Sequence, residues 1–274
     1  MASPIDLAGL NKTKLHLGDF AQNFYREATP FGSVFSYYAA AVPFAAEDLR
    51  DFVDDPIAAL PPRILAGVGK VVLLFVPYLE RPAAAPSGKR HAAEKAPAAF
   101  DPRESLVAMD APAAADRLAV AYLPPSADGE PHIFAFGIQG VDASDFHYSF
   151  FHAIAQLVLR TQPDSSFVAY RNLLREELKS RAHGEVDDEA WKAKLALLKK
   201  ESGLRGESKL FLEYARNSMV DTLTLFLHGI CCDIDVEPGP RQIASRYLRK
   251  RLQLLQAEFP QPEGYAVFPE ELKN

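Results

Sequence analysis

The chain has 274 residues, of which 48% are hydrophobic and 24% charged, so it has enough apolar material for one large core or two small ones. Its formal net charge of -6 argues against general nucleic-acid binding, which needs an excess of Lys and Arg. Every apolar run is much shorter than the about 18 residues that a membrane span requires, and the first residues lack a secretory signal. The frequent use of alanine is typical of a GC-rich bacterial genome. Together, these features lead us to expect a soluble bacterial cytoplasmic protein without a membrane segment.

The N-terminal half predicts helices followed by a small sheet. Apolar residues at helix-like spacing, interrupted by Pro30 and Pro43, predict helices within the first sixty residues. The continuous apolar run at 70–76 predicts a central strand buried on both faces. Two β-rich runs, 118–123 and 132–138, flank a turn that contains Asp128-Gly129 and predict a hairpin. Together these runs indicate a small mixed sheet of about three strands.

Between residues 81 and 116 the sequence is rich in Ala and Pro and has no sustained period, which predicts a long flexible loop. Beyond Gly140 the pattern becomes helical. We expect helices at about 142–160, 166–181, 188–200, 208–228 and 241–258, bounded by Pro and Gly. The predicted fold is therefore a single α+β domain over residues 1–274, with N-terminal helices and a mostly helical C-terminal half.

The helices carry two kinds of charged surface. Mixed charges at helical spacing in 171–179 and 192–200 are typical of solvated faces. The last helix is basic and amphipathic, which is compatible with an anionic surface, but the acidic total charge favours a solvated face on a helix docked by its leucines. Its basic residues are Arg241, Arg246, Arg249, Lys250 and Arg251.

The two cysteines, Cys231 and Cys232, are sequence neighbours. A disulfide between neighbours is strained, and two thiolates alone do not complete a four-ligand zinc site. We expect core thiols at the end of an apolar helix. A thiol catalyst built on His228 and Cys231 is the less favoured alternative, because Gly229 between them is better explained as a helix end.

Two polar stripes on these otherwise apolar helices are the candidate binding residues. No Lys or Glu occurs between residues 143 and 158, so the helix there is expected to be mostly buried. A polar stripe on a buried helix must face a partner, a cavity or other polar groups. The stripes comprise Tyr148, His152 and Gln156 on the first helix, and Glu213, Asn217, Asp221, Thr224 and His228 on the helix at 208–228.

The segment His152-Ala-Ile-Ala-Gln156 resembles the helix motif of the zincin metallopeptidases, in which two His four residues apart bind zinc and a Glu after the first His activates water. It departs from that motif twice, with Ala153 in place of the Glu and Gln156 in place of the second His. A small sheet before the motif and an acidic residue on a later helix are also similar to the family. The resemblance implies His152 as a zinc ligand, with Glu213 or Asp221 facing it.

Two functions therefore stay open. The first is a non-catalytic binding or assembly module with an unknown protein partner and no cofactor. The alternative is a zincin-like metal-dependent hydrolase with a degraded motif, whose only cofactor would be zinc. The surroundings of His152 distinguish them, because a metalloenzyme needs His152 and an acidic residue to converge beside an open cavity, whereas a packed contact between the stripes favours the structural role.

Overall fold

The computed structural model describes residues 14–39, 44–82, 101–199, 207–231 and 242–268. Contacts divide the chain into two compact units. The sheet unit comprises residues 1–49 and 69–142, and the helical unit comprises residues 50–68 and 143–274. The α+β class predicted from the sequence is confirmed, while the single domain over 1–274 stays a prediction.

The sheet unit contains two sheets. A five-stranded mixed sheet has the order β2-β3-β4-β9-β8, in which β3, β4 and β9 are parallel and β2 and β8 pair antiparallel at the edges. A four-stranded antiparallel sheet has the order β1-β6-β5-β7. The strands are β1 (Leu15–His16), β2 (Thr29–Phe31), β3 (Phe35–Ala39), β4 (Val71–Val76), β5 (Tyr78–Glu80), β6 (Leu106–Ala108), β7 (Arg117–Leu118), β8 (Val120–Leu123) and β9 (His132–Gly137).

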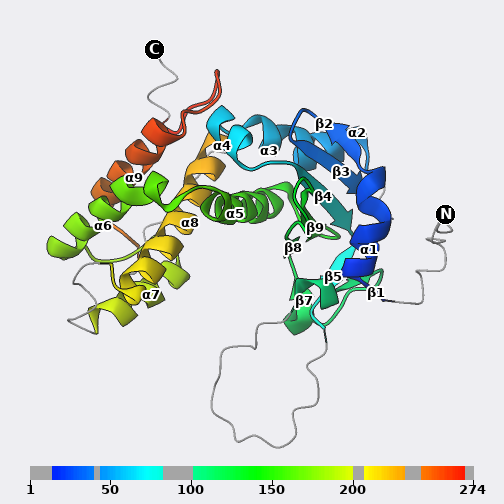
Figure 1. Cartoon of the computed structure of the whole chain (residues 1–274), viewed down its shortest axis with the longest axis horizontal. Helices are drawn as coiled ribbons and strands as arrows, with labels where there is room; N and C mark the ends of the chain where they lie inside the picture. The colour runs from blue at the N-terminus through cyan, green and yellow to red at the C-terminus, as the bar shows by residue number, and fades with distance from the viewer. Residues whose placement is uncertain (1–13, 40–43, 83–100, 200–206, 232–241, 269–274) are drawn as a thin grey trace, which may run out of the picture. The chain divides into compact units, whose positions relative to one another are not determined.

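Helix α1 (Leu17–Phe24) packs on the sheets of this unit (Figure 1). Its buried residues join alternate residues of β4 in one core, including Phe20, Val72 and Leu74. The β4 residues are buried throughout, as expected for a strand covered on both faces. At the end of β9 the two sheets approach closely, because a Cβ on Gly137 would lie 2.9 Å from the backbone nitrogen of Leu79. Short helical segments complete the unit: η2 (Tyr25–Glu27), α2 (Ala46–Leu49), η4 (Pro102–Glu104) and η5 (Ala114–Asp116).

The central strand at 70–76 and the hairpin at 118–138 are confirmed as β4 and as β8 with β9. The sheet of about three strands was an underestimate. Residues 29–31 and 35–39 form β2 and β3 rather than helix, because pairing with β4 outweighs the helix-like spacing of their apolar residues. The predicted loop at 81–116 contains β6, which pairs with β1 and β5, and residues 83–100 of it lie outside the described residues.

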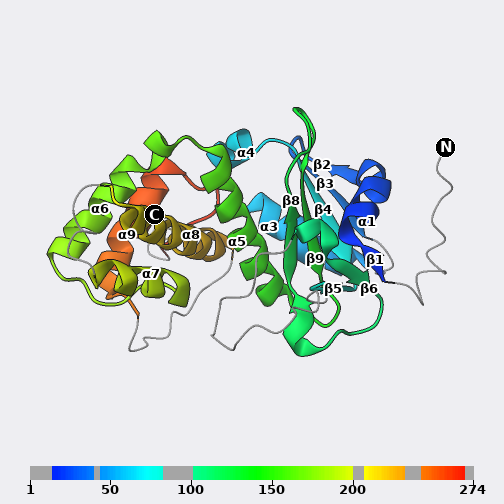
Figure 2. The same cartoon turned by 60° about the horizontal axis from the view of Figure 1, so that its bottom comes forward.

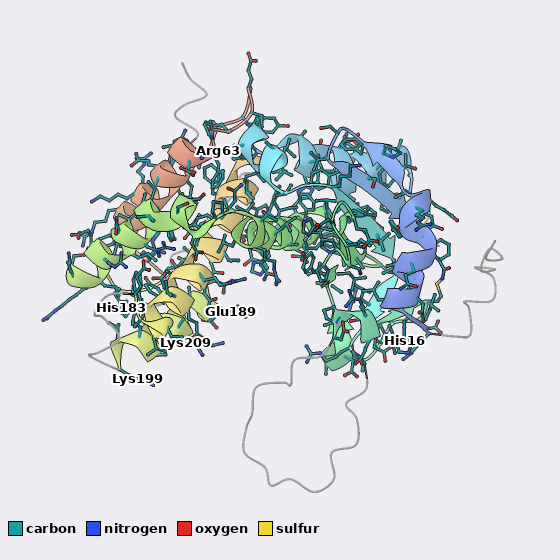
Figure 3. All side chains as sticks on the ribbon, in the orientation of Figure 1. His16, Arg63, His183, Glu189, Lys199 and Lys209 are labelled. Carbon is teal, nitrogen blue, oxygen red and sulfur yellow. The ribbon has the colours of Figure 1, made fainter. Side chains whose placement is uncertain are left out.

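The helical unit follows the predicted order closely. Helices α5, α7 and α9 pack beside α8 (Figure 2). Helix α9 is tied to α4 by an ion pair between Glu258 and Arg63, which is labelled in Figure 3. The helices are η3, a π-helical turn (Arg50–Asp54), α3 (Asp55–Ala58), α4 (Pro62–Gly67), α5 (Ala143–Thr161), η6 (Asp164–Phe167), α6 (Val168–Lys179), α7 (Asp188–Leu198), α8 (Lys209–Cys231) and α9 (Ser245–Glu258).

Arg251 of α9 is fully buried, at 0% exposure, and joins three elements of this unit. Its Nη2 donates to Glu177 Oε2 of α6 at 2.6 Å, and its Nη1 donates to Glu185 Oε2 at 2.7 Å. Nη1 also donates to Ser218 Oγ of α8 at 2.9 Å. The planar guanidinium thus satisfies two carboxylates at once, which a lysine ammonium cannot do with the same geometry.

Lys194 of α7 supplies the second buried cation. Its Nζ donates to Glu185 Oε1 at 3.1 Å and to the carbonyl of Gly184 at 2.8 Å. The hydroxyl of Tyr214 also donates to Glu185 Oε1. Burial by itself raises the pKa of Glu185, but the hydrogen bonds and charge of Arg251, with the charge of Lys194, outweigh it and hold the pKa below its usual value. The buried network of Arg251, Lys194, Glu177 and Glu185 therefore has balanced charge.

This network corrects the prediction that 171–179, 192–200 and the basic last helix present only solvated charges. Glu177 is 2% exposed and Lys194 is 1% exposed. In α9, Arg251 is buried, whereas Lys250, the residue before it, is exposed. Helical periodicity identifies a polar face, but it does not identify which polar residue another helix covers. The partner here comes from a segment far away in the sequence.

Replacing Arg251 with methionine is expected to destabilise the helical unit by about 3–5 kcal/mol, because Glu177 and Glu185 then stay buried with one cation between them. Lys250→Met, one position earlier and exposed, removes the same charge and is expected to change the unfolding free energy by less than about 0.5 kcal/mol. Urea unfolding followed by the fluorescence of Trp191, the single tryptophan, measures both. Equal effects of the two variants would contradict the role of the network.

Candidate functional site

The predicted polar stripes of α5 and α8 meet inside the helical unit. The Thr224 hydroxyl lies 3.5 Å from His152 Nδ1, and the rings of Tyr148 and His228 are in edge contact with centroids 6.2 Å apart. Asp221 is one turn before Thr224 on α8 and is buried. The structure therefore brings together Tyr148, His152, Asp221, Thr224 and His228.

His152 is held by both ring nitrogens. The Gln156 amide donates to Nε2 at 2.9 Å, so this nitrogen is an acceptor. The Thr224 hydroxyl donates to the carbonyl of Val220 at 2.8 Å, which leaves its oxygen to accept from Nδ1. We assign the neutral tautomer with the proton on Nδ1 from this network. Burial lowers the pKa of His152, with Glu189 and Asp187 opposing the shift, which agrees with a neutral ring.

Tyr148 connects α5 to the segment before α7. Its hydroxyl donates to Asp187 Oδ2 at 2.9 Å, and Asp187 Oδ1 accepts from the backbone N–H of Asp188 at the start of α7. Burial, followed by the charge and hydrogen bond of Asp187, raises the pKa of Tyr148 well above its ordinary value. The phenol therefore stays protonated at neutral pH and acts as a donor to the carboxylate.

Asp221 is the buried carboxyl group of the site. It is 5% exposed, and its Oδ2 has no hydrogen-bond partner among the described residues. Burial, followed by the charge of Asp187, raises its pKa to about 7, although the backbone N–H of Ala190 lowers it. A buried carboxyl with an unused oxygen carries a free-energy cost that a hydrogen bond or a cation would relieve.

A pocket of about 120 Å³ opens beside Asp221. Its polar residues include Tyr148, Asp187 and Asp221, and its apolar walls come from α8, α9 and the segments before α7 and α9. The apolar lining residues are Val186, Leu225, Ile243 and Leu248. The volume of this pocket lies below the about 300–1,000 Å³ of most small-molecule sites, but apolar walls with a few convergent polar groups are the usual composition of such a site.

The buried network fixes the walls of this pocket. Glu185, held by Arg251 and Lys194, forms a parallel β-bridge with Gln242. Its carbonyl accepts from the N–H of Ile243 at 3.1 Å. The adjoining residues of both segments line the pocket, so the ionic contacts of Glu185 position Asp187 opposite Asp221.

His147 and Cys231 form a separate contact between α5 and α8. His147 Nε2 donates to the carbonyl of Asp51 at 2.6 Å, and its Nδ1 lies 3.8 Å from the Cys231 sulfur. His147 is buried and Cys231, the last residue of α8, is half-buried. This arrangement agrees with the thiol at the end of an apolar helix predicted for Cys231, while Cys232 lies outside the described residues.

Two predicted residues do not join the site. Glu213 is exposed and precedes Thr224, the contact of His152, by three turns, about 16 Å along the helix axis. Asn217 is half-buried one turn before Asp221 and makes no hydrogen bond with the His152 group in the described structure. Among the described residues, no group of three or more His, Cys, Asp or Glu is placed to hold a metal. The zinc site of His152 with Glu213 therefore gains no geometric support.

Asp187 is the main site residue that the sequence reasoning missed. It lies at the N-cap of α7, within the acidic segment Asp187-Asp188-Glu189. Such a segment is ordinary at a helix start, because acidic groups complement the helix dipole there. Its second role depends on Tyr148, 39 residues earlier, which no local pattern reveals. Figure 3 labels Glu189, the last of the three acidic residues.

No family model, curated protein or solved structure matches this chain. In the described part of the chain, no helix is both long and apolar enough to cross a lipid bilayer.

The zinc alternative has a direct test. If the resemblance to the zincins extends to metal binding, purified protein will contain about one zinc per chain, and His152→Ala will remove it. Elemental analysis and the melting temperature with and without added zinc measure this. Because Gln156 occupies Nε2 of His152, we expect zinc to leave the melting temperature unchanged, and stoichiometric zinc lost in His152→Ala would reverse that expectation.

The raised pKa of Asp221 predicts that the protein loses stability as pH rises. The unfolded carboxyl releases its proton near pH 4, whereas the folded one keeps it up to about pH 7. Its contribution is complete below about pH 4 and is lost towards pH 7, which amounts to about 2–3 kcal/mol between pH 5 and 8. Asp221→Asn cannot ionise, so urea unfolding should lose correspondingly less stability over this interval. Asp164→Asn, at an exposed position of the same unit, should behave like wild type, and identical pH profiles for all three proteins would contradict the assignment.

Proposed function

We propose that this protein is a non-catalytic binding module whose helical unit receives a primary ammonium group in the pocket beside Asp221. The observation that carries this proposal is the buried Asp221 carboxyl with an Oδ2 that has no partner among the described residues. A cation in contact with that oxygen would favour the ionised carboxylate and relieve the cost of its burial. The cytoplasmic location predicted from the sequence is part of the same proposal.

The charges around the pocket support a cationic ligand. Asp187 lines it with Asp221, and the exposed Glu189 follows on the first turn of α7. Their negative charges raise the pKa of Asp221, so they also attract a positive ligand to the same place. Neutral His152 adds no competing positive charge.

The size and apolar walls of the pocket support a short aliphatic chain behind the charge. A volume of about 120 Å³ corresponds to a few water-sized groups, since one water occupies about 30 Å³ in the liquid. Leu225, Ile243 and Leu248 form apolar walls that suit methylene groups. The stem of a lysine side chain, or a free amine of four carbons, has this combination of a short apolar chain and a compact ammonium.

The polar residues around the pocket support binding rather than catalysis. Tyr148 has a raised pKa and donates to Asp187, so it does not provide a phenolate nucleophile at neutral pH. The Nε2 of His152 is hydrogen-bonded to Gln156 and is not directed at the pocket carboxyls by any described contact. An ionised Asp221 therefore serves as a counter-ion in this proposal.

The proposal is tested by titrating the protein with n-butylammonium and with Nα-acetyl-lysine amide, which represent a free amine and a lysine of a protein partner. Binding should strengthen roughly tenfold between pH 6 and pH 8, because Asp221 must ionise. Chemical shifts or calorimetry measure the dissociation constant. Asp221→Asn should abolish binding of both probes, and neutral n-butanol should not compete.

Asp164→Asn is the matched control, since it removes an exposed carboxyl from the same unit. Preference for the lysine amide would identify a protein partner, and preference for butylammonium a small amine. Absence of saturable binding by either probe at pH 8, or equal binding by Asp221→Asn, would refute the proposed function.

A further inference from the structure

A cavity in the sheet unit shares no lining residue with the pocket beside Asp221. Its volume is about 420 Å³, compared with about 120 Å³ for that pocket. Cavities of about 300–1,000 Å³ are typical of small-molecule sites. It lies between α1 with η2, the segment of η4, and the turn that joins β8 to β9.

Part of the cavity wall is apolar and stiff, while Gln22 and Ser126 add polar groups to the lining. Tyr25 and Ala21 line it from one side, and Pro124, Pro125 and Pro131 line it from the β8–β9 turn. Proline has a fixed φ and no backbone N–H, so these residues present apolar surface with little freedom to rearrange. Such walls suit the hydrocarbon body of a ligand.

Two arginines give the cavity its positive charge. Arg26 is exposed, and its Nε donates to the hydroxyl of Tyr25 at 2.9 Å. No carboxylate lies within 4.0 Å of Arg26 in the described structure. In the described structure the guanidinium of Arg103 has only a 3.4 Å contact from Nη2 to Ser126 Oγ and a 3.9 Å contact to Asp101, which is half-exposed. Both guanidinium groups therefore keep unused donors.

Glu130 is the acidic residue that lines the cavity. Its Oε2 accepts from the backbone N–H of Ser126 at 3.0 Å, which holds the β8–β9 turn. The cavity lining therefore carries two guanidinium groups and one carboxylate, while Asp101, 3.9 Å from Arg103, lies outside the lining. Guanidinium forks match the planar geometry of a carboxylate, which they bind with charge-assisted hydrogen bonds.

The geometry points to this cavity as a binding site for a small carboxylate with an apolar body, held by Arg26 and Arg103 and packed against Tyr25 and the prolines. Arg26 belongs to η2 and Arg103 to η4, so a carboxylate bound by both arginines would link these two elements. Glu130 opposes the charge of the ligand and limits its affinity. The site is independent of the function proposed for the helical unit.

The test uses 3-phenylpropionate, which combines a carboxylate with an apolar ring. Calorimetry or amide chemical shifts should give saturable binding with a dissociation constant below about 1 mM, the range expected for a ligand of this size. Phenethylammonium, which has the same ring and opposite charge, should not bind here. Inorganic phosphate, which has no apolar body, should bind at least about tenfold more weakly.

Three variants assign the interaction to its residues. Arg26→Gln and Arg103→Gln should each weaken binding by about tenfold or more, and Glu130→Gln should strengthen it. Lys70→Gln removes an exposed positive charge from the same unit and should leave the affinity unchanged. Unchanged melting temperatures of the arginine variants, both exposed in the structure, show that they remain folded. No saturable binding of 3-phenylpropionate, equal binding of phosphate, or unchanged affinity in both arginine variants would overturn the assignment.

Discussion

The buried guanidinium of Arg251 is the constraint on which the helical unit depends. It joins α9 to Glu177 of α6, to Glu185 in the segment before α7, and to Ser218 of α8. A buried charge is tolerated only when groups of opposite charge surround it. Here the two carboxylates of Glu177 and Glu185 are balanced by the two cations Arg251 and Lys194. These directional contacts act only when the four elements are in register, so they specify one arrangement of helices that apolar contacts alone would leave less well defined.

The same network determines where the acidic pocket forms. Glu185 is anchored through its side chain, and its backbone accepts from Ile243, so the residues on either side have little choice of position. Asp187 is thereby placed near the buried Asp221, and its negative charge disfavours ionisation of Asp221. The charge-balanced network thus holds in place a pocket in which two acidic side chains lie close together without a cation among the described lining residues. Local strain of this kind is characteristic of functional sites, because a ligand can relieve it.

The sequence was sufficient for elements whose signal is local. The apolar run of β4, the β8–β9 turn and the five C-terminal helices carry their own periodicity and Pro or Gly boundaries. The short strands β3 and β6 were missed because they are stabilised by pairing with residues distant in the chain. The stripes allowed Glu213 or Asp221 to face His152, but they did not indicate that Thr224 would be its contact on α8 or that Glu213 would stay exposed. The angle at which two helices cross decides how far along each helix the contact extends, and no local pattern contains that angle.

The sequence also did not indicate which charged residues would be buried. Arg251 and Lys250 are adjacent and similar in sequence, yet one is buried and the other exposed, because only one faces Glu177 and Glu185. In the described structure Arg26 has no carboxylate within 4.0 Å and Arg103 has only a 3.9 Å contact with Asp101, and both line a cavity where an anion would find unused donors. Among the described residues, Asp221 has no positively charged partner. A ligand suited to one site therefore meets unfavourable charge at the other, so the two units would select ligands of opposite charge without any steric discrimination.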